Sequence, residues 1–329
     1  MIPPNDFFSV CINCRTYNQS GFIQDAMDGF TAQQTSFPFL TVLIDDASTD
    51  GEQECIDAYV SCYFGHGEDA IMERWETDDA RWIYARHDEN VNAYFLVVLL
   101  KHNLFRSPKK GKLVADWTRV KYIAICEGDD YWTDPLKLQK QVDFLEQNPD
   151  YSLCFTNCRV SDGKRTRKGN SYIWDTYTTE DMLLHNSLGL KKRKDLIVSP
   201  GHTSTVVYRK PLAPRPPTWI SKCFIGDEPS FIWLSTFGKA KFINDVTSTY
   251  RQGVGVSTAN FSFVDDDCKR IEMYRLIDKG LEYKYHKLIS RDIIAEYYYS
   301  LVKRTYKQKD YLKAVRFFFG YLVHKSGLA

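Results

Sequence analysis

The sequence lacks a long apolar run and an excess of charge of either sign. Its run Phe95 to Leu100 is much shorter than the roughly 20 apolar residues that a membrane-spanning helix needs. The 43 Lys and Arg nearly balance the 42 Asp and Glu, so the net charge of +1 gives no general attraction to nucleic acid. The segment Met1 to Asp6 has neither the basic region nor the apolar core of a signal peptide. We therefore predict a cytoplasmic protein that does not bind nucleic acid.

The cysteines show no pattern of disulfides or of a zinc site. There are nine of them, an odd number, and Cys11 and Cys14 have CxxC spacing without a second such pair. We therefore predict reduced thiols. Cys55 and Cys62 lie seven residues apart on an expected helix, and we predict that they fill the core.

The first half of the chain alternates strand-like and helix-like segments. This alternation is typical of an α/β fold with a mostly parallel central sheet flanked by helices. The expected strands are 7–12, 39–44, 82–85 and 122–126, and the expected helices are 22–30, 55–63, 93–103 and 136–147.

The second half has a looser pattern that becomes helical towards its end. Strands are expected at 152–156, 198–208 and 241–250, with a helix at 229–238. From Asp265 onwards nearly every segment has a helical pattern. We therefore predict an α/β domain over residues 1–255 and a C-terminal helical region over residues 256–329.

Three carboxylates follow the expected strand 122–126 within four residues. They belong to Glu127, Asp129 and Asp130. Crowded carboxylates repel one another, so such a group at a strand end indicates a bound divalent cation. Oxygen ligands favour hard ions, here Mg²⁺ or Mn²⁺. An acidic turn that caps the next helix would explain Asp134 but not the three residues before it.

Polar segments follow four expected strands. They are Arg15 to Asn18, Asp45 to Gly51, His87 to Asn92 and Glu127 to Trp132. Open sheets of this class bind ligands at the carboxyl ends of their strands. We therefore expect these four segments to meet at one rim and to form a ligand site.

These segments resemble the motifs of the inverting family 2 glycosyltransferases with the GT-A fold, of the type that acts in bacterial polysaccharide biosynthesis. The resemblance covers roughly residues 7 to 255 and implies that residues 1–255 are a GT-A domain, which is Rossmann-like. It rests on Ser9 to Ile12 with Thr16 to Asn18, on Asp45 to Gly51, on Tyr122 to Ala124 with Glu127 to Trp132, and on Gly226 to Glu228.

The resemblance implies a nucleotide site at the first two strand ends. Tyr17 would stack on the base, and Asp46 would accept a hydrogen bond from a ring N–H, with Asp45 nearby. Each has a structural alternative, since Tyr17 could pack on the first helix and the two aspartates could cap turns. Arg251 would bind the diphosphate. His202 would contact the acceptor or a phosphate, or serve only in the fold.

The resemblance also implies a metal site and a catalytic base. Asp129 and Asp130, with Glu127, would form the DxD-type motif, and Asp130 would contact the metal directly. Asp227 would be the base, although it could instead favour the start of a helix electrostatically. The choice between Asp227 and Glu228 as base stays open.

Together these features predict an enzyme, a Mn²⁺- or Mg²⁺-dependent glycosyltransferase of hexosyltransferase type. It would move a sugar from a nucleotide-diphosphate sugar, expected to be a UDP-sugar, to a hydroxyl of a glycan or lipid-linked acceptor. Two alternatives stay open. One is a nucleotidyltransferase acting on sugar phosphates, although the first strand end has too few glycines for its usual loop. The other is a non-catalytic scaffold that binds nucleotide sugars.

The C-terminal region interleaves basic and aromatic residues, as in Val302 to Arg304 and Val315 to Lys325. Such a surface could rest on the inner face of the plasma membrane, where lipid-linked acceptors are found. Alternatively, a helical hairpin packs here on the catalytic domain or on a second subunit, which would make a homodimer. Both interpretations stay open, and packing is the simpler one.

Overall fold

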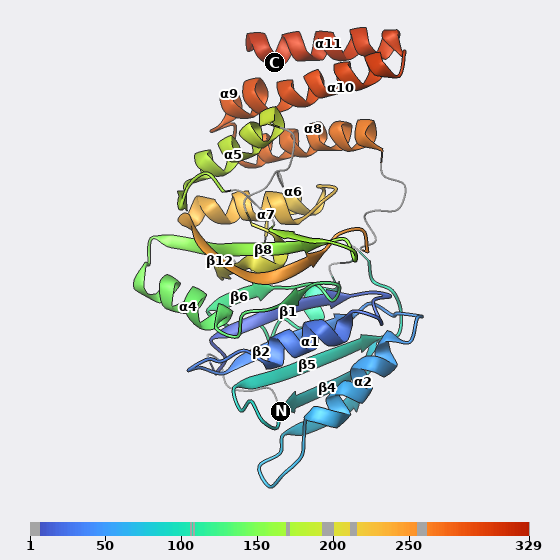
Figure 1. Ribbon diagram of the computed structural model, residues 1–329, viewed down its shortest axis with the longest axis vertical. Helices are drawn as coiled ribbons and strands as arrows, with labels where there is room; N and C mark the ends of the chain where they lie inside the picture. The colour runs from blue at the N-terminus through green and yellow to red at the C-terminus, as the bar shows by residue number, and fades with distance from the viewer. Residues whose placement is uncertain are drawn as a thin grey trace.

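The computed structural model describes residues 7–105, 107, 109–168, 172–192, 201–210, 216–254 and 262–328. The molecule is elongated, with the sheet and its covering helices towards one end and the C-terminal helices stacked at the other (Figure 1). This arrangement confirms the predicted α/β class with a C-terminal helical region.

A single mixed sheet has a parallel core of four strands. β1 lies between β2 and β6, and β5 pairs with the far side of β2, all in parallel register. The order along the sheet is β10-β12-β8-β11-β6-β1-β2-β5-β4-β3, while β7 pairs with β12 and β9 with β8. The strands are β1 Val10–Thr16, β2 Phe39–Asp45, β3 Met72–Glu76, β4 Ala80–Arg86, β5 Ala93–Leu100, β6 Tyr122–Ile125, β7 Tyr131–Trp132, β8 Tyr151–Ser161, β9 Thr166–Lys168, β10 Thr176–Tyr177, β11 Val206–Arg209 and β12 Lys239–Arg251.

The predicted helix at 93–103 was wrong, because residues Ala93–Leu100 form strand β5. Every residue of β5 is buried, and the strand lies between β2 and β4. A strand covered on both faces is apolar throughout, so it lacks the alternation that identifies half-exposed strands. Its β-branched and aromatic residues were the remaining signal.

Because residues 93–100 form a strand, the segment His87 to Asn92 lies at the opposite ends of the strands from the polar rim. β4 runs antiparallel to β5, so the end of β4 lies beside the start of β2 rather than its end. The Asn90 side-chain amide donates to the carbonyl oxygens of Thr31 and Gln33, at 2.8 and 2.7 Å, just before β2 begins. Three strand ends, not four, therefore meet at the polar rim.

Three of the predicted helices cover one face of the sheet around a shared apolar cluster. They are α1 Ile23–Thr31, α2 Glu52–Tyr63 and α4 Lys137–Gln147. In α1, a Cβ at Gly29 would lie 2.9 Å from the backbone nitrogen and oxygen of Trp132, so only glycine allows this close approach. Cys55 and Cys62 are exposed on α2, so the prediction that they fill the core was wrong.

Of the remaining helices, α8 to α11 lie in the C-terminal region that was predicted to be helical, and the others precede it. The remaining helices are α3 Lys109–Leu113, α5 Thr179–Lys192, α6 Thr218–Ser221, α7 Asp227–Leu234, α8 Phe263–Gly280, α9 His286–Leu288, α10 Ala295–Lys307 and α11 Tyr311–Ser326, with a π-helical segment at Ile289–Ile294 and 3₁₀ turns at Thr203–Thr205 and Ser235–Phe237. Within the described ranges, no helix is both long and apolar enough to cross a membrane.

One apolar cluster joins the sheet to the C-terminal helices. It contains Phe155 and Phe231 together with Tyr274 and Leu301. The predicted domain boundary after residue 255 falls in the undescribed segment 255–261, and residues on both sides of it share this core. Of the predicted strand 198–208, residues 198–200 also lie outside the described part, and the strand that is described there is β11.

Lys137, at the start of α4, is fully buried. Its Nζ lies 2.6 Å from Oε1 of Gln141 and 4.4 Å from the centre of the Trp132 ring. An amide and an aromatic ring replace hydration less well than a carboxylate would. Burial therefore lowers the pKa of Lys137 to about 8.

Burying the charged Lys137 side chain lowers the free energy of unfolding, and we expect this loss to disappear at alkaline pH. Between pH 8 and 10.5 the native lysine loses its proton while the unfolded one keeps it, so stability rises with pH. The free energy of unfolding of the wild type should rise by about 3 kcal/mol relative to Lys137→Met across this window. Urea unfolding at several pH values measures the difference. The exposed Lys164→Met serves as the control, and parallel curves for wild type and Lys137→Met would contradict the expectation.

Candidate functional site

The three predicted carboxylates converge directly after β6. One carboxylate oxygen from each of Glu127, Asp129 and Asp130 lies within 4.8 Å of the others. Asp130 is the most deeply buried of the three, whereas the Glu127 side chain reaches solvent. Three convergent carboxylates are a donor set suited to a hard divalent cation, so this cluster could hold one.

Contacts with two other strands hold the cluster in place. The backbone N–H of Arg251, at the end of β12, donates to Oδ1 of Asp130 at 2.9 Å. On the other side, a Cβ at Gly128 would lie only 2.4 Å from Oγ1 of Thr16, so the chain passes against the end of β1. Oγ1 of Thr203 donates to Glu127 at 3.3 Å. The segment is therefore clamped between β1 and β12.

The environment makes all three carboxyl groups hold their protons more tightly than usual. Burial, and then the charge of Asp129, raise the pKa of Asp130 well above its ordinary value. Burial also raises the pKa of Asp129. For Glu127, desolvation by the surrounding protein and the charges of Asp129 and Asp227 raise the pKa, although contact with water makes the desolvation partial. A cation would relieve this repulsion.

His202 also lies at the cluster. Its Nδ1 is 3.7 Å from Oδ2 of Asp130 and 3.0 Å from Oγ of Ser204, and its ring packs on that of Tyr250 with centroids 4.3 Å apart. Burial lowers the pKa of His202 to about 4, so the imidazole is neutral at physiological pH. Neutral imidazole is the form that binds metals. The sequence analysis named His202 as a contact of the acceptor or a phosphate, but its place beside Asp130 was not predicted.

Asp227 and Glu228, at the start of α7, have opposite environments. Glu228 is buried, accepts a hydrogen bond from the Tyr274 hydroxyl, and pairs with Arg270 at 3.1 Å. Asp227 is exposed, and its charge acts on the pKa of both Glu127 and His202, so it lies near the cluster. Of the two carboxylates, the structure leaves Asp227 open to a ligand.

Two aspartates that were predicted to bind the nucleotide base, Asp45 and Asp46, lie at the end of β2. Oδ2 of Asp46 lies 2.7 Å from Nζ of Lys110, and its Oδ1 accepts from the backbone N–H of Leu104 at 2.7 Å. Asp45 is fully buried, and its Oδ1 accepts from the Ser48 backbone N–H, which stabilises the turn before α2. The Tyr17 side chain is half-buried at the end of β1. Sequence reasoning did not find Lys110.

Arg251 lies next to the cluster, but among the described residues its ion pair is with Asp25 and not with the three clustered carboxylates. Its guanidinium donates to the carbonyl oxygen of Asp129 at 2.8 Å and pairs with Asp25. It also lies over the ring of Tyr131, 4.4 Å from the centroid. In this arrangement the arginine holds the acidic segment in place and is paired with Asp25.

Comparison with known sequences finds relatives that match part of the chain. No family model matches the chain. Uncharacterised proteins of Mycobacterium bovis and Mycobacterium tuberculosis are 34% identical over 197 residues, which is 59% of this chain and 45% of theirs. The chain thus spans less than half the length of the curated relatives it matches.

Solved structures of TarS residues 1–349 from S. aureus are similar over nearly the whole chain. The form crystallised with UDP-GlcNAc has a TM-score of 0.57 and 14% identity, and covers 96% of this chain and 81% of that one. The crystal structure described without a ligand has a TM-score of 0.56 and 12% identity, over 97% and 80%. The fold, a mixed sheet with a parallel core and a C-terminal helical region, is GT-A-like, as predicted.

The raised pKa of Asp130 predicts that this carboxylate destabilises the metal-free protein. Because its folded pKa lies above the unfolded value, ionisation costs stability as pH rises above about 4. Asp130→Asn keeps the acceptor for the Arg251 N–H but removes the charge. At pH 7 with a chelator, we expect its melting temperature to rise by about 2 °C or more, and the gain to shrink in acid. Asp162→Asn, at an exposed loop, should show no gain. A lower melting temperature for Asp130→Asn would contradict this account.

Proposed function

We propose that this chain is a metal-dependent glycosyltransferase that moves a sugar from a nucleotide-diphosphate sugar to an acceptor hydroxyl. The observation that carries the proposal is the convergence of Glu127, Asp129 and Asp130 at the end of β6, with the exposed Asp227 beside them, in a GT-A-like fold. TarS, which has a similar fold, was crystallised with UDP-GlcNAc. This supports a sugar nucleotide as the donor class.

In this proposal, Asp130, Asp129 and Glu127 hold Mn²⁺ or Mg²⁺. A bound cation of this kind neutralises the charge that develops on a departing diphosphate. The donor set fits such an ion because it consists of oxygens whose mutual repulsion the ion would relieve. The neutral imidazole of His202 lies within reach of the same site.

Asp227 acts as the general base. It accepts the proton of the acceptor hydroxyl as the hydroxyl oxygen bonds to the anomeric carbon and the bond from that carbon to the diphosphate breaks. A single displacement of this kind inverts the anomeric centre, which is the outcome that the family 2 resemblance implies. Glu228 does not compete for the role, since its carboxylate is buried and bound to Arg270 and Tyr274.

The nucleotide base binds at the ends of β1 and β2. Tyr17 stacks on the base, and Asp46 accepts a hydrogen bond from a ring N–H. Lys110, already 2.7 Å from Asp46, adds a donor next to that acceptor. Uracil and guanine each present a ring N–H beside a carbonyl oxygen, which matches an acceptor beside a donor. Because TarS was crystallised with UDP-GlcNAc, we favour a UDP-sugar. The guanidinium of Arg251, which is paired with Asp25, binds the diphosphate.

The acceptor is a hydroxyl of a glycan or of a lipid-linked saccharide, as in polysaccharide assembly. This part of the proposal rests on the resemblance of the sequence motifs.

Release of UDP from a panel of UDP-sugars in Mn²⁺ tests the activity. We expect Asp227→Asn to lower turnover by about 10²-fold or more while UDP affinity stays the same, because a general base contributes to the chemical step. Glu228→Gln is the neighbouring control, and its turnover should fall less. Asp130→Ala should lose both turnover and the rise in melting temperature on adding Mn²⁺.

Three results would count against the proposed reaction. Release of pyrophosphate from a nucleoside triphosphate would indicate a nucleotidyltransferase. Binding of UDP-sugars without any release of UDP, with all acceptors tried, would indicate a scaffold. Full turnover in Asp227→Asn would remove this residue as the base.

The relative affinities of nucleoside diphosphates test the nucleotide-base site separately. A site that pairs an acceptor with a donor accepts uracil, whereas adenine presents an acceptor nitrogen where uracil has its N–H. We expect UDP to bind at least about tenfold more tightly than ADP, since a buried polar group left unpaired is costly. Calorimetric titration of each nucleotide in Mn²⁺ measures the ratio, and equal affinities would remove Asp46 from base recognition.

A further inference from the structure

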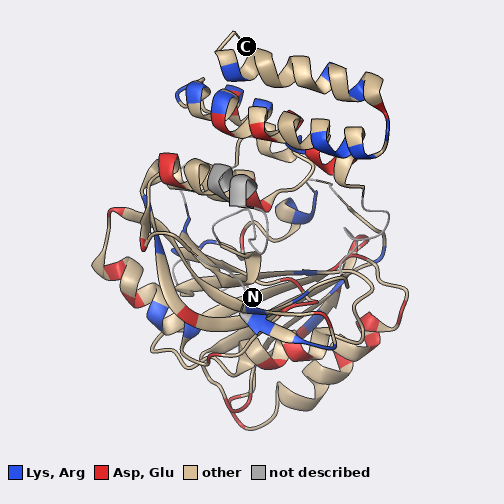
Figure 2. Ribbon diagram, turned by 45° about the horizontal axis from the view of Figure 1, so that its top comes forward, with Lys and Arg blue, Asp and Glu red and all other residues tan. Residues whose placement is uncertain are grey.

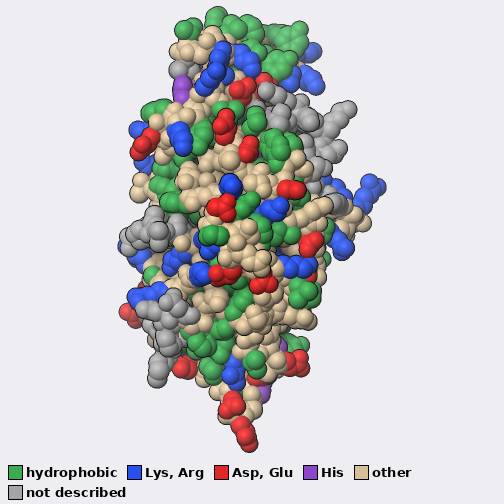
Figure 3. All heavy atoms as spheres, turned by 90° about the vertical axis from the view of Figure 1, so that its left-hand side faces the viewer, with side chains coloured by type: hydrophobic (Ala, Val, Ile, Leu, Met, Phe, Trp, Pro, Cys, Tyr) green, Lys and Arg blue, Asp and Glu red, His purple; other side chains and the backbone are tan. Residues whose placement is uncertain are grey.

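α11 has an uncovered apolar face at one end of the molecule. Its buried residues, Ala314 and His324, lie on the side that packs against α10. Its other side exposes between 42% and 87% of each of seven apolar or aromatic side chains, which are Tyr311, Leu312, Val315, Phe318, Phe319, Leu322 and Val323. Hydrophobic side chains gather at this end of the molecule in the space-filling view (Figure 3).

The spacing of these residues makes a continuous stripe. Leu312, Val315, Phe319 and Leu322 follow one another at intervals of three and four residues, so they share one helix face. Soluble monomers rarely expose a contiguous apolar surface of more than a few hundred Å² unless it binds something. Because α11 lies across the end of the long axis (Figure 1), whatever covers it contacts the molecule end-on.

The surroundings of the stripe are strongly basic. Residues 295–329, which hold α10 and α11, contain seven Lys and Arg and two acids, Glu296 and Asp310, which gives a charge of +5. Arg304 pairs with Asp267, and Lys325 lies 3.8 Å from Glu296. The whole chain carries +1, so residues 1–294 carry −4. Figure 2 shows these basic positions along α10 and near its turn into α11, whereas most of α11 itself is uncharged.

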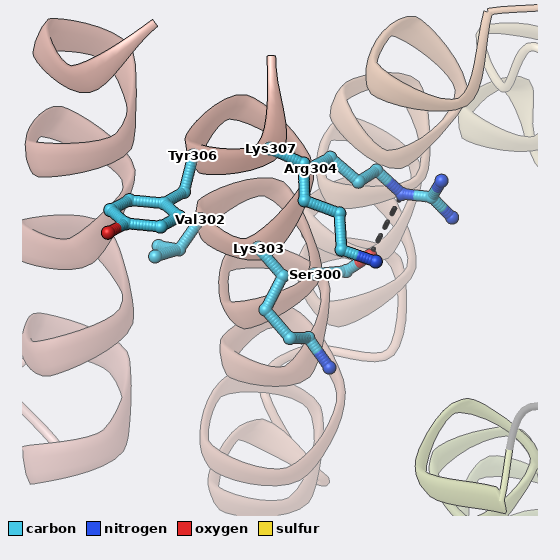
Figure 4. A pocket seen from close by; sticks show the side chains of 6 residues that line it. All are labelled: Ser300, Val302, Lys303, Arg304, Tyr306 and Lys307. Carbon is cyan, nitrogen blue, oxygen red and sulfur yellow. Dashed lines mark hydrogen bonds between the residues drawn. The ribbon is translucent and has the colours of Figure 1, made fainter. Parts of the chain in front are cut away.

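Part of this charge lines a hollow of about 470 Å³ on α10. Figure 4 shows Lys303, Arg304 and Lys307 on a different side of the helix from Tyr306. Tyr306 instead packs on Tyr311 at the start of α11, with ring centroids 5.5 Å apart. The hollow lies far from the acidic cluster and has the opposite charge, so it belongs to the C-terminal surface rather than to the candidate active site.

We propose that α11 docks on an anionic lipid bilayer. The apolar stripe lies at the boundary of the acyl chains, and basic residues at the same end of the molecule, including Arg316 on α11 and Lys307 at the end of α10, contact lipid phosphates. A second copy of this chain fits the same face less well, because a symmetric dimer would bring two copies of this basic end together. The proposal rests on this surface alone and does not depend on the proposed reaction.

Flotation with lipid vesicles tests the proposal on the full chain. One set of vesicles contains phosphatidylcholine alone, and in the other about a third of the lipid is phosphatidylglycerol. We expect the wild type to float with the anionic vesicles and to be released by salt. Leu312→Glu with Phe319→Glu should weaken binding by about tenfold or more, since two large apolar side chains no longer enter the bilayer.

Two further variants separate charge and position. Lys307→Glu with Arg316→Glu keeps the stripe but should lose the preference for anionic vesicles. Val91→Glu with Phe237→Glu places the same charges on exposed apolar residues elsewhere, 59% and 50% exposed, and should bind like the wild type. All substituted side chains are exposed, and equal melting temperatures confirm that each variant is folded.

Three outcomes would overturn the proposal. The wild type could fail to float with anionic vesicles. The Val91 and Phe237 variant could lose binding as much as the Leu312 and Phe319 variant. Sedimentation could instead reveal a dimer that Leu312→Glu with Phe319→Glu dissociates, without any vesicle binding, in which case a second copy covers the stripe.

Discussion

The mutual repulsion of three neighbouring carboxylates is the constraint around which the rim of the sheet is built. One carboxylate oxygen from each of Glu127, Asp129 and Asp130 lies within 4.8 Å of the others, although no described cation pairs with these oxygens. The backbone of β12 binds Asp130, and Gly128 lets the segment approach β1. Keeping three carboxylates together costs stability in the metal-free protein, as expected where stability is exchanged for function.

The fold could be predicted wherever the sequence carried a clear period. The amphipathic stripe of α1 and the short apolar run of β6 were recognised. β5 was missed because burial on both faces removes its alternation and leaves a run that also suits a buried helix. That single error also misplaced His87 to Asn92, since the direction of β4 depends on whether a helix or a tight loop follows it.

The candidate site could be predicted in its contiguous parts but not in its tertiary contacts. The acidic segment can be recognised in the sequence because its charged residues are close together along the chain. In contrast, Lys110 meets Asp46 across 64 positions and Arg251 meets Asp25 across 226. A lysine in a polar loop and an arginine at a strand end look like solvated residues until the fold places them, so their partners leave no local pattern.

The buried carboxylate of Glu228 has a consequence for how this chain could be recombined with others. It lies next to Asp227 on α7, while its partners Arg270 and Tyr274 belong to α8. Removing the partners of a buried charge costs about 3–5 kcal/mol. A graft of foreign C-terminal helices onto this sheet would therefore have to bring new partners for Glu228 or come with a substitution at this position.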